Sequence, residues 1–314
     1  MDSSAKGALV TINIDGKPLE KLIEVVSSGI GTLYRPRKIR KEADAQAYAI
    51  KVIEKAKAEA GSETKLIEVD TAERIGQRLA AKEVRRQENI DSVVEMAAKE
   101  LSGTEVSDKP VEEDWSSRFF DIVQDVSRDE MKALWAKILA KEIQKPSSYS
   151  LRTLEVLRNL SYEEAEMFVK LSEFVVKHGI CFVFCKDKVL DKYGLKYYYL
   201  AKLREAGLLQ SETMVTKTFS SGGGISTKHT VIYGNIVIFI TLPGNSTNVL
   251  MPIYLLSQAG LELYELTEHK ENMRYLNDIA AFVKSANPSA TFEYGRIIEI
   301  NDEQVKYELP LKTI

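Results

Sequence analysis

The spacing of apolar residues predicts helices over much of the first half of the chain. Apolar positions at residues 19–33 recur at helical spacing, on a helix that begins at Pro18 after a short predicted strand at residues 8–14. Proline-free stretches rich in Ala, Lys and Glu predict two long helices, at residues 38–60 and 64–101. These helices carry few large apolar residues, so we expect them to pack against a partner helix from their own chain or from a second copy.

The segment that follows Pro110 is more apolar and predicts a compact helical bundle. Ser127-Arg-Asp-Glu130 and Ser161-Tyr-Glu-Glu164 match the capping box, in which a serine and a glutamate three residues later satisfy free amide groups at the start of a helix. We expect a helix after each box, the second over residues 165–177, and another at residues 151–160. Five residues form a structural signature that should organise this bundle: Asp114, Trp115, Phe119, Phe120 and Trp135.

From His178 onward the apolar pattern changes from helical to strand-like. This part of the chain is predicted to contain both strands and helices. The strands lie at residues 179–185, 214–219, 230–242 (with a turn or bulge near Tyr233), 291–294 and 305–309, the last two paired, and the helices at 195–206, 261–264 and 272–284. The sequence therefore predicts an α+β protein whose first two thirds are mostly α-helical. We divide it into three domains, at residues 1–105, 106–177 and 178–314.

The order of elements after Tyr197 resembles a winged helix. A helix ends at Gly207-Leu-Leu209, and two strands follow around the glycine-rich residues 220–225, as a wing would. If this part bound nucleic acid, the contacts would come from two cations on the helix and two on the wing: Lys202, Arg204, Lys217 and Lys228. A winged-helix-like fold that serves protein contacts or packing is the favoured interpretation, because the density of basic residues is modest.

Composition fits a globular cytoplasmic protein. The 314 residues carry 43 basic and 46 acidic side chains, a formal net charge of −3, which excludes a generally basic nucleic-acid binder. Two cysteines exclude a disulfide scaffold, three histidines exclude most metal hydrolases, and we see no secretion signal. The apolar runs fall short of the ~20 residues that a membrane-spanning helix needs. We expect no cofactor and no metal.

One basic cluster stands out against this even balance. Its five cations lie close together in the sequence: Arg35, Arg37, Lys38, Arg40 and Lys41. Phosphate-binding surfaces and interfacial membrane helices both use such clusters. Because Glu42 and Asp44 offset the charge, a solvated junction between helices is the favoured interpretation, ahead of contact with an anionic ligand or nucleic acid and, last, with a membrane. The cluster is the candidate surface for a partner or an anion.

Two further motifs have an unremarkable structural explanation. His178, Cys181 and Cys185 offer soft metal ligands, but roughly 13 Å would separate the two cysteines along a strand, so we interpret them as buried structural residues. Gly222–Gly224 lacks the strand-to-helix context of a phosphate-binding loop. We expect a flexible hairpin tip there, exposed to partners.

Two segments carry the residues of a family signature. One, around residues 113–154, contains Glu113-Asp-Trp-Ser-Ser-Arg-Phe-Phe-Asp121, Val126-Ser-Arg-Asp-Glu-Met-Lys-Ala-Leu-Trp-Ala-Lys-Ile-Leu-Ala140 and Ser148-Tyr-Ser-Leu-Arg-Thr-Leu154, and the other is Gly29-Ile-Gly-Thr-Leu-Tyr-Arg-Pro-Arg-Lys-Ile-Arg40. They resemble an uncharacterised bacterial family catalogued as a domain of unknown function, over residues 19–175. The resemblance implies no catalytic residues. The helix at residues 134–140 is also similar to abortive-infection (phage-defence) proteins, which implies a role in defence or stress.

These features lead to one expected function and two alternatives. We expect a non-enzymatic interaction or effector protein that self-associates through its N-terminal helices and acts in bacterial anti-phage defence. One alternative is a nucleic-acid-binding protein that uses the winged-helix-like domain. The other is a metal-dependent hydrolase or nuclease built on Asp121 and Asp125, which lie one predicted helical turn apart. The expected partners are a second copy and a further protein or nucleic acid, without membrane contact.

Overall fold

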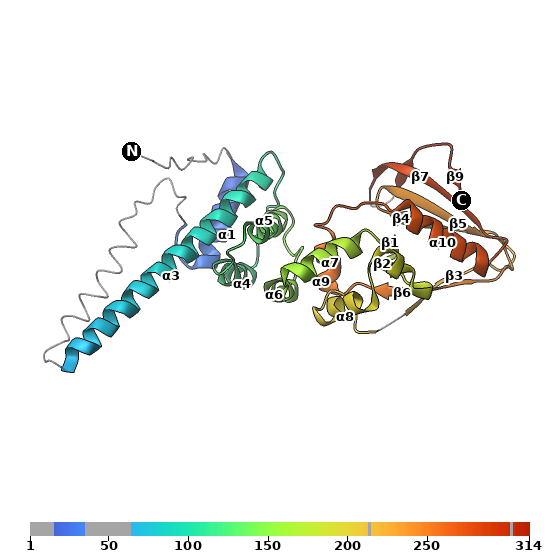
Figure 1. Ribbon diagram of the computed structural model, residues 1–314. Coiled ribbons are helices and arrows are strands. Elements are labelled where there is room, and N and C mark those ends of the chain that lie inside the picture. Colours follow the sequence, from blue (N-terminus) through green and yellow to red (C-terminus); the bar gives the residue numbers. More distant parts are fainter. Residues whose placement is uncertain (1–15, 35–63, 213–214, 302–303) are drawn as a thin grey trace, which may run out of the picture. The chain divides into compact units, whose positions relative to one another are not determined.

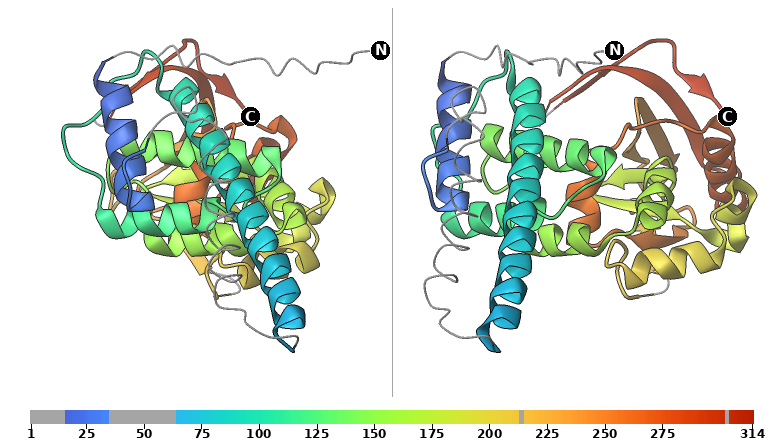
Figure 2. Two further views of the ribbon diagram at one scale, coloured as in Figure 1. Left: turned by 90° about the vertical axis from the view of Figure 1, so that its left-hand side faces the viewer. Right: turned by 60° about the vertical axis from the view of Figure 1, so that its left-hand side comes forward.

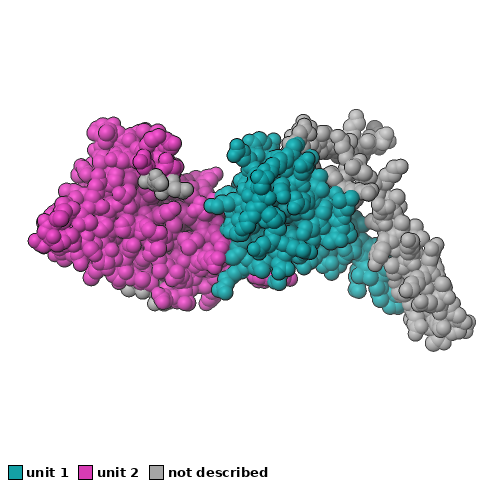
Figure 3. Space-filling model, turned by 180° about the vertical axis from the view of Figure 1, so that it is seen from behind, with its two compact units in different colours: residues 1–154 teal, residues 155–314 magenta. Residues whose placement is uncertain are grey.

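The computed structural model describes residues 16–34, 64–212, 215–301 and 304–314. The chain divides into two compact units, Met1–Leu154 and Glu155–Ile314, which Figure 3 colours separately. The strand expected at residues 8–14 and the helix expected at 38–60 lie outside the described residues. The three-domain division stays a prediction. None of the helices in the described ranges combines the length and the apolar character needed to cross a membrane.

Unit 1 is built from packed helices (Figure 1). Their bounds are α1 (Lys17–Ile30), α3 (Thr64–Leu101), α4 (Glu113–Val123), α5 (Asp129–Gln144) and the start of α6 (Leu151–Asn159). The predicted bounds of α3 are confirmed. Its C-terminal half packs on α5, and α1 packs on α4. Views from two further directions show α3 running past the other helices of this unit (Figure 2).

An aromatic cluster from α4 and α5 fills the core of unit 1. Trp115 stacks on Phe119 at 5.0 Å between ring centroids, and Trp135 meets the Phe119 ring edge-on at 5.4 Å. The indole N–H of Trp115 donates to the carbonyl oxygen of Tyr149 at 2.8 Å, which ties α4 to the segment before α6. These rings are buried, whereas Asp114 is exposed in the first turn of α4.

A glycine sets how closely α1 and α4 approach. A Cβ atom on Gly29 would lie 2.7 Å from the carbonyl oxygen of Ser116 and would overlap the ring of Phe120. Non-bonded heavy atoms pack favourably at about 3.5–4.0 Å, so a side chain cannot fit here without moving one helix. The contact between α1 and α4 therefore depends on the missing side chain.

A buried carboxylate organises the connection between α5 and α6. Glu142 is 2% exposed, and its oxygens accept hydrogen bonds from the backbone amides of Ser147, Ser148 and Tyr149 at 2.6, 3.0 and 3.0 Å. Ser147 has a φ of 71°, in the left-handed region that non-glycine residues seldom occupy. A charged acceptor thus satisfies three amides in a segment that is neither helix nor strand.

Unit 2 combines an antiparallel sheet with short helices. The helices are α7 (Tyr162–Ser172), the 3₁₀ helix η2 (Lys186–Tyr193), α8 (Tyr197–Glu205), α9 (Gln258–Tyr264) and α10 (Met273–Ala286). The strands are β1 (Val175–His178), β2 (Ile180–Phe184), β3 (Val215–Phe219), β4 (Thr227–Tyr233), β5 (Ile236–Leu242), β6 (Val249–Leu255), β7 (Thr291–Ile300), β8 (Val305–Tyr307) and β9 (Lys312–Thr313). Their order is β3-β6-β2-β1-β4-β5-β7-β8, and β9 also pairs with β7.

The two faces of this sheet differ in what covers them. We call the face that bears Val176, Phe182 and Val231 the inner face, because these side chains meet Ile279 of α10 in an apolar core. The other face is the outer face. Successive residues of a strand point to opposite faces, so the register assigns every strand residue to one of them.

The α+β class is confirmed, and three details of the predicted elements are wrong. The expected wing does not form, because β3 pairs with β6 while β4 pairs with β5 and β1. The turn expected near Tyr233 is confirmed, because Gly234 divides the predicted strand at 230–242 into β4 and β5. The helix after Ser161 ends at Ser172, and β1 follows it. Finally, Arg128, not Ser127, precedes α5, without a side-chain cap.

Two other predictions are confirmed. The capping box at Ser161 and Glu164 is present, with the serine hydroxyl accepting from the Glu164 amide and the Glu164 carboxylate accepting from the Ser161 amide. The two late strands also pair, as β7 and β8, but through residues 297–300 of β7, beyond the predicted strand at 291–294.

Replacing Glu142 should destabilise unit 1 strongly. The Glu142→Ala variant leaves three amides near the core without their acceptor, so we expect it to lower the free energy of unfolding by about 3 kcal/mol. Urea unfolding followed by tryptophan fluorescence measures unit 1 selectively, because Trp115 and Trp135 are the two tryptophans of the chain and both lie in this unit. The matched control is Glu130→Ala, at an exposed glutamate of α5, with an expected change below about 0.5 kcal/mol. Equal effects of the two substitutions would contradict the role given to Glu142.

Candidate functional site

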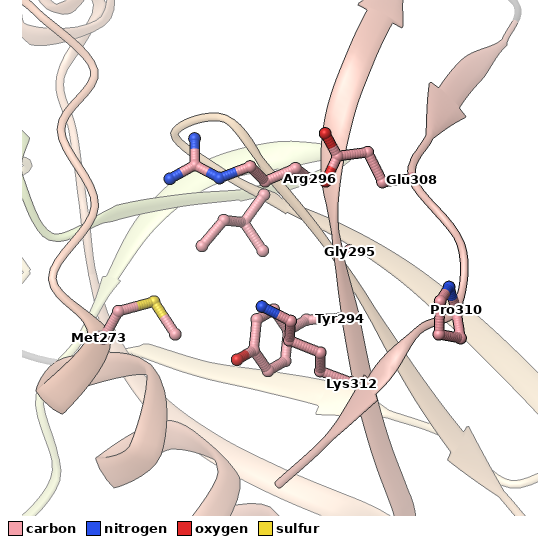
Figure 4. Close-up of a pocket in the computed structure, with 8 residues that line it drawn as sticks. Met273, Tyr294, Gly295, Arg296, Glu308, Pro310 and Lys312 are labelled. Atoms are coloured by element: carbon pink, nitrogen blue, oxygen red, sulfur yellow. The ribbon is translucent and has the colours of Figure 1, made fainter.

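A surface pocket lies at the end of the inner face where β5, β7 and β9 meet the first turn of α10 (Figure 4). Its volume is about 390 Å³. Sites for small molecules fall at roughly 300–1,000 Å³, so the pocket has the size of a small-ligand site. Tyr294 and Arg296 from β7, Lys312 from β9 and Met273 from α10 supply its principal side chains.

Strand register explains why these side chains meet. Arg296 pairs with Ile236, and Tyr294 pairs with both Ile238 and Lys312, so the cation on β9 lies directly across from the tyrosine on β7. Tyr294 and Arg296 are two residues apart and share the inner face. Figure 4 shows Arg296, Tyr294 and Lys312 extending to the side of β7 that faces Met273.

The charges of the pocket have few partners within the protein. Arg296 and Lys312 are exposed, and among the described residues neither side chain makes an ion pair. Glu308 is the one acidic residue in the lining. The lining therefore carries a net positive charge, which suits an anionic group.

This pocket was not among the sites expected from the sequence. The alternation of Tyr294 and Arg296 within a predicted strand was the available signal that they share a face. Lys312 stands on a strand of two residues, too short for any periodicity to show. The pairing of β9 with β7 is what brings it to the site.

The structure does not gather the four cations of the expected nucleic-acid surface. Lys217 alternates with the buried Phe219 and shares the inner face, whereas Lys228 lies on the outer face, with its Nζ atom 3.7 Å from the centroid of the Phe239 ring. On α8, the Nζ atom of Lys202 is 3.1 Å from Glu163 Oε2. Contacts with Tyr198 and Glu163 raise the pKa of Lys202 to about 12. Three separate elements, α8, β3 and β4, thus hold these cations, and the two on strands lie on opposite faces of the sheet.

Arg204 is the least satisfied of the four cations. Its Nε and Nη2 atoms are buried and have no hydrogen-bond partner in the described part of the chain. The guanidinium lies over the ring of Tyr254, 5.8 Å from its centroid. Cation–π attraction of this kind gives Arg204 a packing role on the outer face of β6.

The glycine-rich segment is not a free hairpin tip. It connects two strands that do not pair, and it packs against residues 244–248. The hydroxyl of Ser221 donates to the carbonyl oxygen of Ser246 at 2.6 Å, and the amide of Gly224 donates to Asn245 Oδ1 at 3.0 Å. Within this segment Ile225 is exposed, with 75% of its surface accessible to solvent.

His178 packs with rings from other strands and not with the two cysteines as metal ligands. Its ring centroid is 5.0 Å from that of Phe219 and 5.5 Å from that of His229. Burial raises the pKa of the half-buried Cys181, and that of Cys185 to about 12, so both thiols stay protonated. Over the residues that the structure describes, no group of three His, Cys, Asp or Glu side chains could hold a metal ion.

The carboxylate pair expected at Asp121 and Asp125 does not form. Because α4 ends at Val123, Asp125 lies beyond the helix. Its carboxylate accepts from Arg86 Nε at 2.9 Å and from Arg86 Nη2 at 3.1 Å. The hydrogen bond from Arg86 holds the pKa of Asp125 below its usual range, so this carboxylate serves as a contact between α3 and the end of α4.

The basic cluster at Arg35, Arg37, Lys38, Arg40 and Lys41 lies outside the described residues. Its role as a surface for a partner or an anion stays a prediction.

The titration of His178 should lower the stability of unit 2 in acid. Burial first, and then the charges of Lys217 and His229, lower the pKa of His178 from 6.5 to about 4. The unfolded chain therefore binds more protons between about pH 6.5 and pH 4, and the stabilisation present above this window is lost as the pH falls through it. Because the ring is half exposed, solvent screening limits the loss to about 1–2 kcal/mol.

Urea unfolding followed by circular dichroism at several pH values measures this loss. His178→Gln should remove it. His269→Gln is the matched control, because His269 is also half-buried, against the ring of Tyr264 at 4.4 Å, and should keep the wild-type loss. A His178→Gln variant with the wild-type pH dependence would contradict the assignment.

The comparisons with known proteins give a family and no activity. No curated protein and no solved structure matches the chain. A family described as "Protein of unknown function (DUF2806)" matches residues 73–180 and 185–280. The matched residues reach into both units and make up more than half of the chain, while β7, β8 and β9 lie beyond them. The protein therefore belongs to the DUF2806 family.

Proposed function

We propose that this DUF2806 protein is a non-enzymatic interaction protein that self-associates through α3. The observation that carries the proposal is a pair of exposed apolar side chains on α3, Ile75 and Leu79, which we call the stripe and which lies beyond the packed part of the helix. Ile90 and Val94 are buried, while Ile75 and Leu79 are 43% and 42% exposed. At about 3.6 residues per turn, Leu79 lies three turns before Ile90 and therefore on the same face.

A second copy of the chain is the occupant that suits this stripe. Large apolar side chains exposed in a row at helical spacing are typical of helix pairing surfaces. Both signs of charge flank the stripe, among them Glu73, Arg78, Glu83 and Arg85. An identical helix can meet such a mixed surface without net repulsion, and two-fold pairing is the commonest form of self-association.

We propose further that the protein acts in the cytoplasm, in bacterial anti-phage defence. The support is the similarity of residues 134–140, in α5, to abortive-infection proteins. Trp135, Ile138 and Leu139 in this helix are fully buried. The shared residues thus form a packing core, and the functional surface of such a protein would lie elsewhere, as the exposed stripe of α3 does.

The two alternative functions gain no comparable support. Nucleic-acid binding through α8 and the following strands needs Lys217 and Lys228 on one surface, and they lie on opposite faces of the sheet. A hydrolase built on Asp121 and Asp125 needs the two carboxylates to act together, and Arg86 binds Asp125.

Charges placed on the stripe should abolish self-association. We expect the wild-type chain to be a dimer or larger at micromolar concentration and the variant Ile75→Glu with Leu79→Glu to be a monomer, because each glutamate would have to be buried unpaired. Light scattering after size-exclusion chromatography measures the mass in solution. The matched control is Val84→Glu, on the same helix but outside the stripe at 38% exposure, which should keep the wild-type mass.

Two results would contradict the proposal. One is a wild-type chain that is strictly monomeric at these concentrations. The other is loss of self-association in the Val84→Glu control to the same extent as in the stripe variant. A phage-plating assay on cells that produce the wild type or the stripe variant tests the defence role. Equal plating on both and on cells without the protein would remove it.

A further inference from the structure

The geometry points to the pocket of β7, β9 and α10 as a binding site for a small phosphorylated molecule of about mononucleotide size. The inference is independent of self-association, because the pocket belongs to unit 2 and the α3 stripe to unit 1. It rests on the placement of two cations, on the fixed walls that carry them, and on the chemistry of the remaining lining.

The two cations can reach one anionic group. Lys312 pairs with Tyr294, so it is the diagonal neighbour of Arg296 on the adjacent strand. Diagonal neighbours on one face of an antiparallel pair lie about 7–8 Å apart, within reach of long side chains. An arginine fork binds two phosphate oxygens at once, and a lysine ammonium binds a third as a point charge. Carboxylates accept the fork as well, but a single carboxylate offers the fork and the ammonium only two oxygens between them, whereas a phosphate offers three.

The backbone that carries these cations is held in place before any ligand binds. Strand β7 pairs with β5 along one edge and with β9 along the other, so Tyr294 is held from both sides. Between it and Arg296 lies Gly295, where an added Cβ atom would be 3.0 Å from the carbonyl oxygen of Glu308. The segment before β9 thus lies directly against β7. Backbone held in this way lowers the entropy lost on binding.

The rest of the lining suits the group that carries the phosphate. A single phosphate would fill only a small part of about 390 Å³. The Tyr294 ring, Met273 and Ile236 offer apolar surface for a base or a sugar. Glu308 offers an acceptor for an amino or hydroxyl group. A phosphate joined to a flat or hydroxylated group uses every one of these features.

Calorimetric titration of the full chain tests the proposal. The probes are AMP, GMP, CMP and UMP, with inorganic pyrophosphate and adenosine as the arms that separate the phosphate from the base. We expect at least one nucleotide to bind with a Kd below about 1 mM, and adenosine to bind at least about tenfold more weakly because it lacks the charged acceptor. Pyrophosphate that binds as tightly as the nucleotides would support the phosphate contact and remove the contribution of the base.

Two substitutions and one control assign the binding to this pocket. Arg296→Gln and Lys312→Gln should each weaken nucleotide binding by about tenfold or more, because each removes a hydrogen bond to a charged group. Lys306→Gln is the matched control. Its lysine is an exposed cation on β8 that pairs with Glu299 outside the pocket, and its loss should leave binding unchanged.

Two outcomes overturn the proposal. The first is the absence of heat from every phosphorylated probe up to about 10 mM, a concentration at which weak sites with ΔG near −3 kcal/mol still respond. The second is binding that Arg296→Gln and Lys312→Gln leave unchanged. Circular dichroism of both variants should match the wild type, since the two side chains are exposed and contribute little to the core.

Discussion

The hydroxyl group of Tyr275 joins α10 to the sheet, and the arrangement of unit 2 depends on this contact. The hydroxyl donates to the carbonyl oxygen of Phe184 at 3.0 Å and accepts from the amide of Phe184 at 2.7 Å. Tyr275 is fully buried, so both hydrogen bonds lie in an apolar interior where unmade ones are costly. Burial also raises the pKa of Tyr275, which keeps the hydroxyl neutral and able both to donate and to accept a hydrogen bond. With α10 held in this way, Ile279 covers the apolar core and Met273 reaches the pocket.

In unit 1 a carboxylate, in place of a hydroxyl group, forms hydrogen bonds with backbone groups near the core. Glu142 serves three amides between two helices, and Tyr275 serves the end of β2. In both units a polar side chain inside the core supplies hydrogen bonds where regular structure stops. The rigid connections of the fold therefore depend on a few polar atoms as well as on apolar area.

Local patterns predicted the helices well and the sheet poorly. The bounds of α3 and the capping box at Ser161 follow from spacing within a few turns, which one stretch of sequence contains. Strand β3 pairs with β6, more than one strand away along the chain, and Pro252 interrupts the donor pattern of β6. Because β3 and β4 follow one another in the sequence, they were expected to pair with each other as a wing. The pocket shows the same limit, because Arg296 and Lys312 become neighbours only through the pairing of β7 with β9. Its strands also lie beyond the residues that match the family, so the family provided no signal for it.

The close contact at Gly29 has a consequence for how this chain can vary. The space that a side chain at this position would need is occupied by the ring of Phe120 and the backbone of Ser116. A substitution at Ser116 leaves its backbone oxygen in place, but a substitution at Phe120 can replace the ring with a smaller side chain. Relatives with alanine at the position of Gly29 should therefore carry a smaller residue at the position of Phe120, together with a wider separation of the two helices. The two positions form a compensating pair, and joint variation in them would record the distance between α1 and α4 in relatives that share this helix pair.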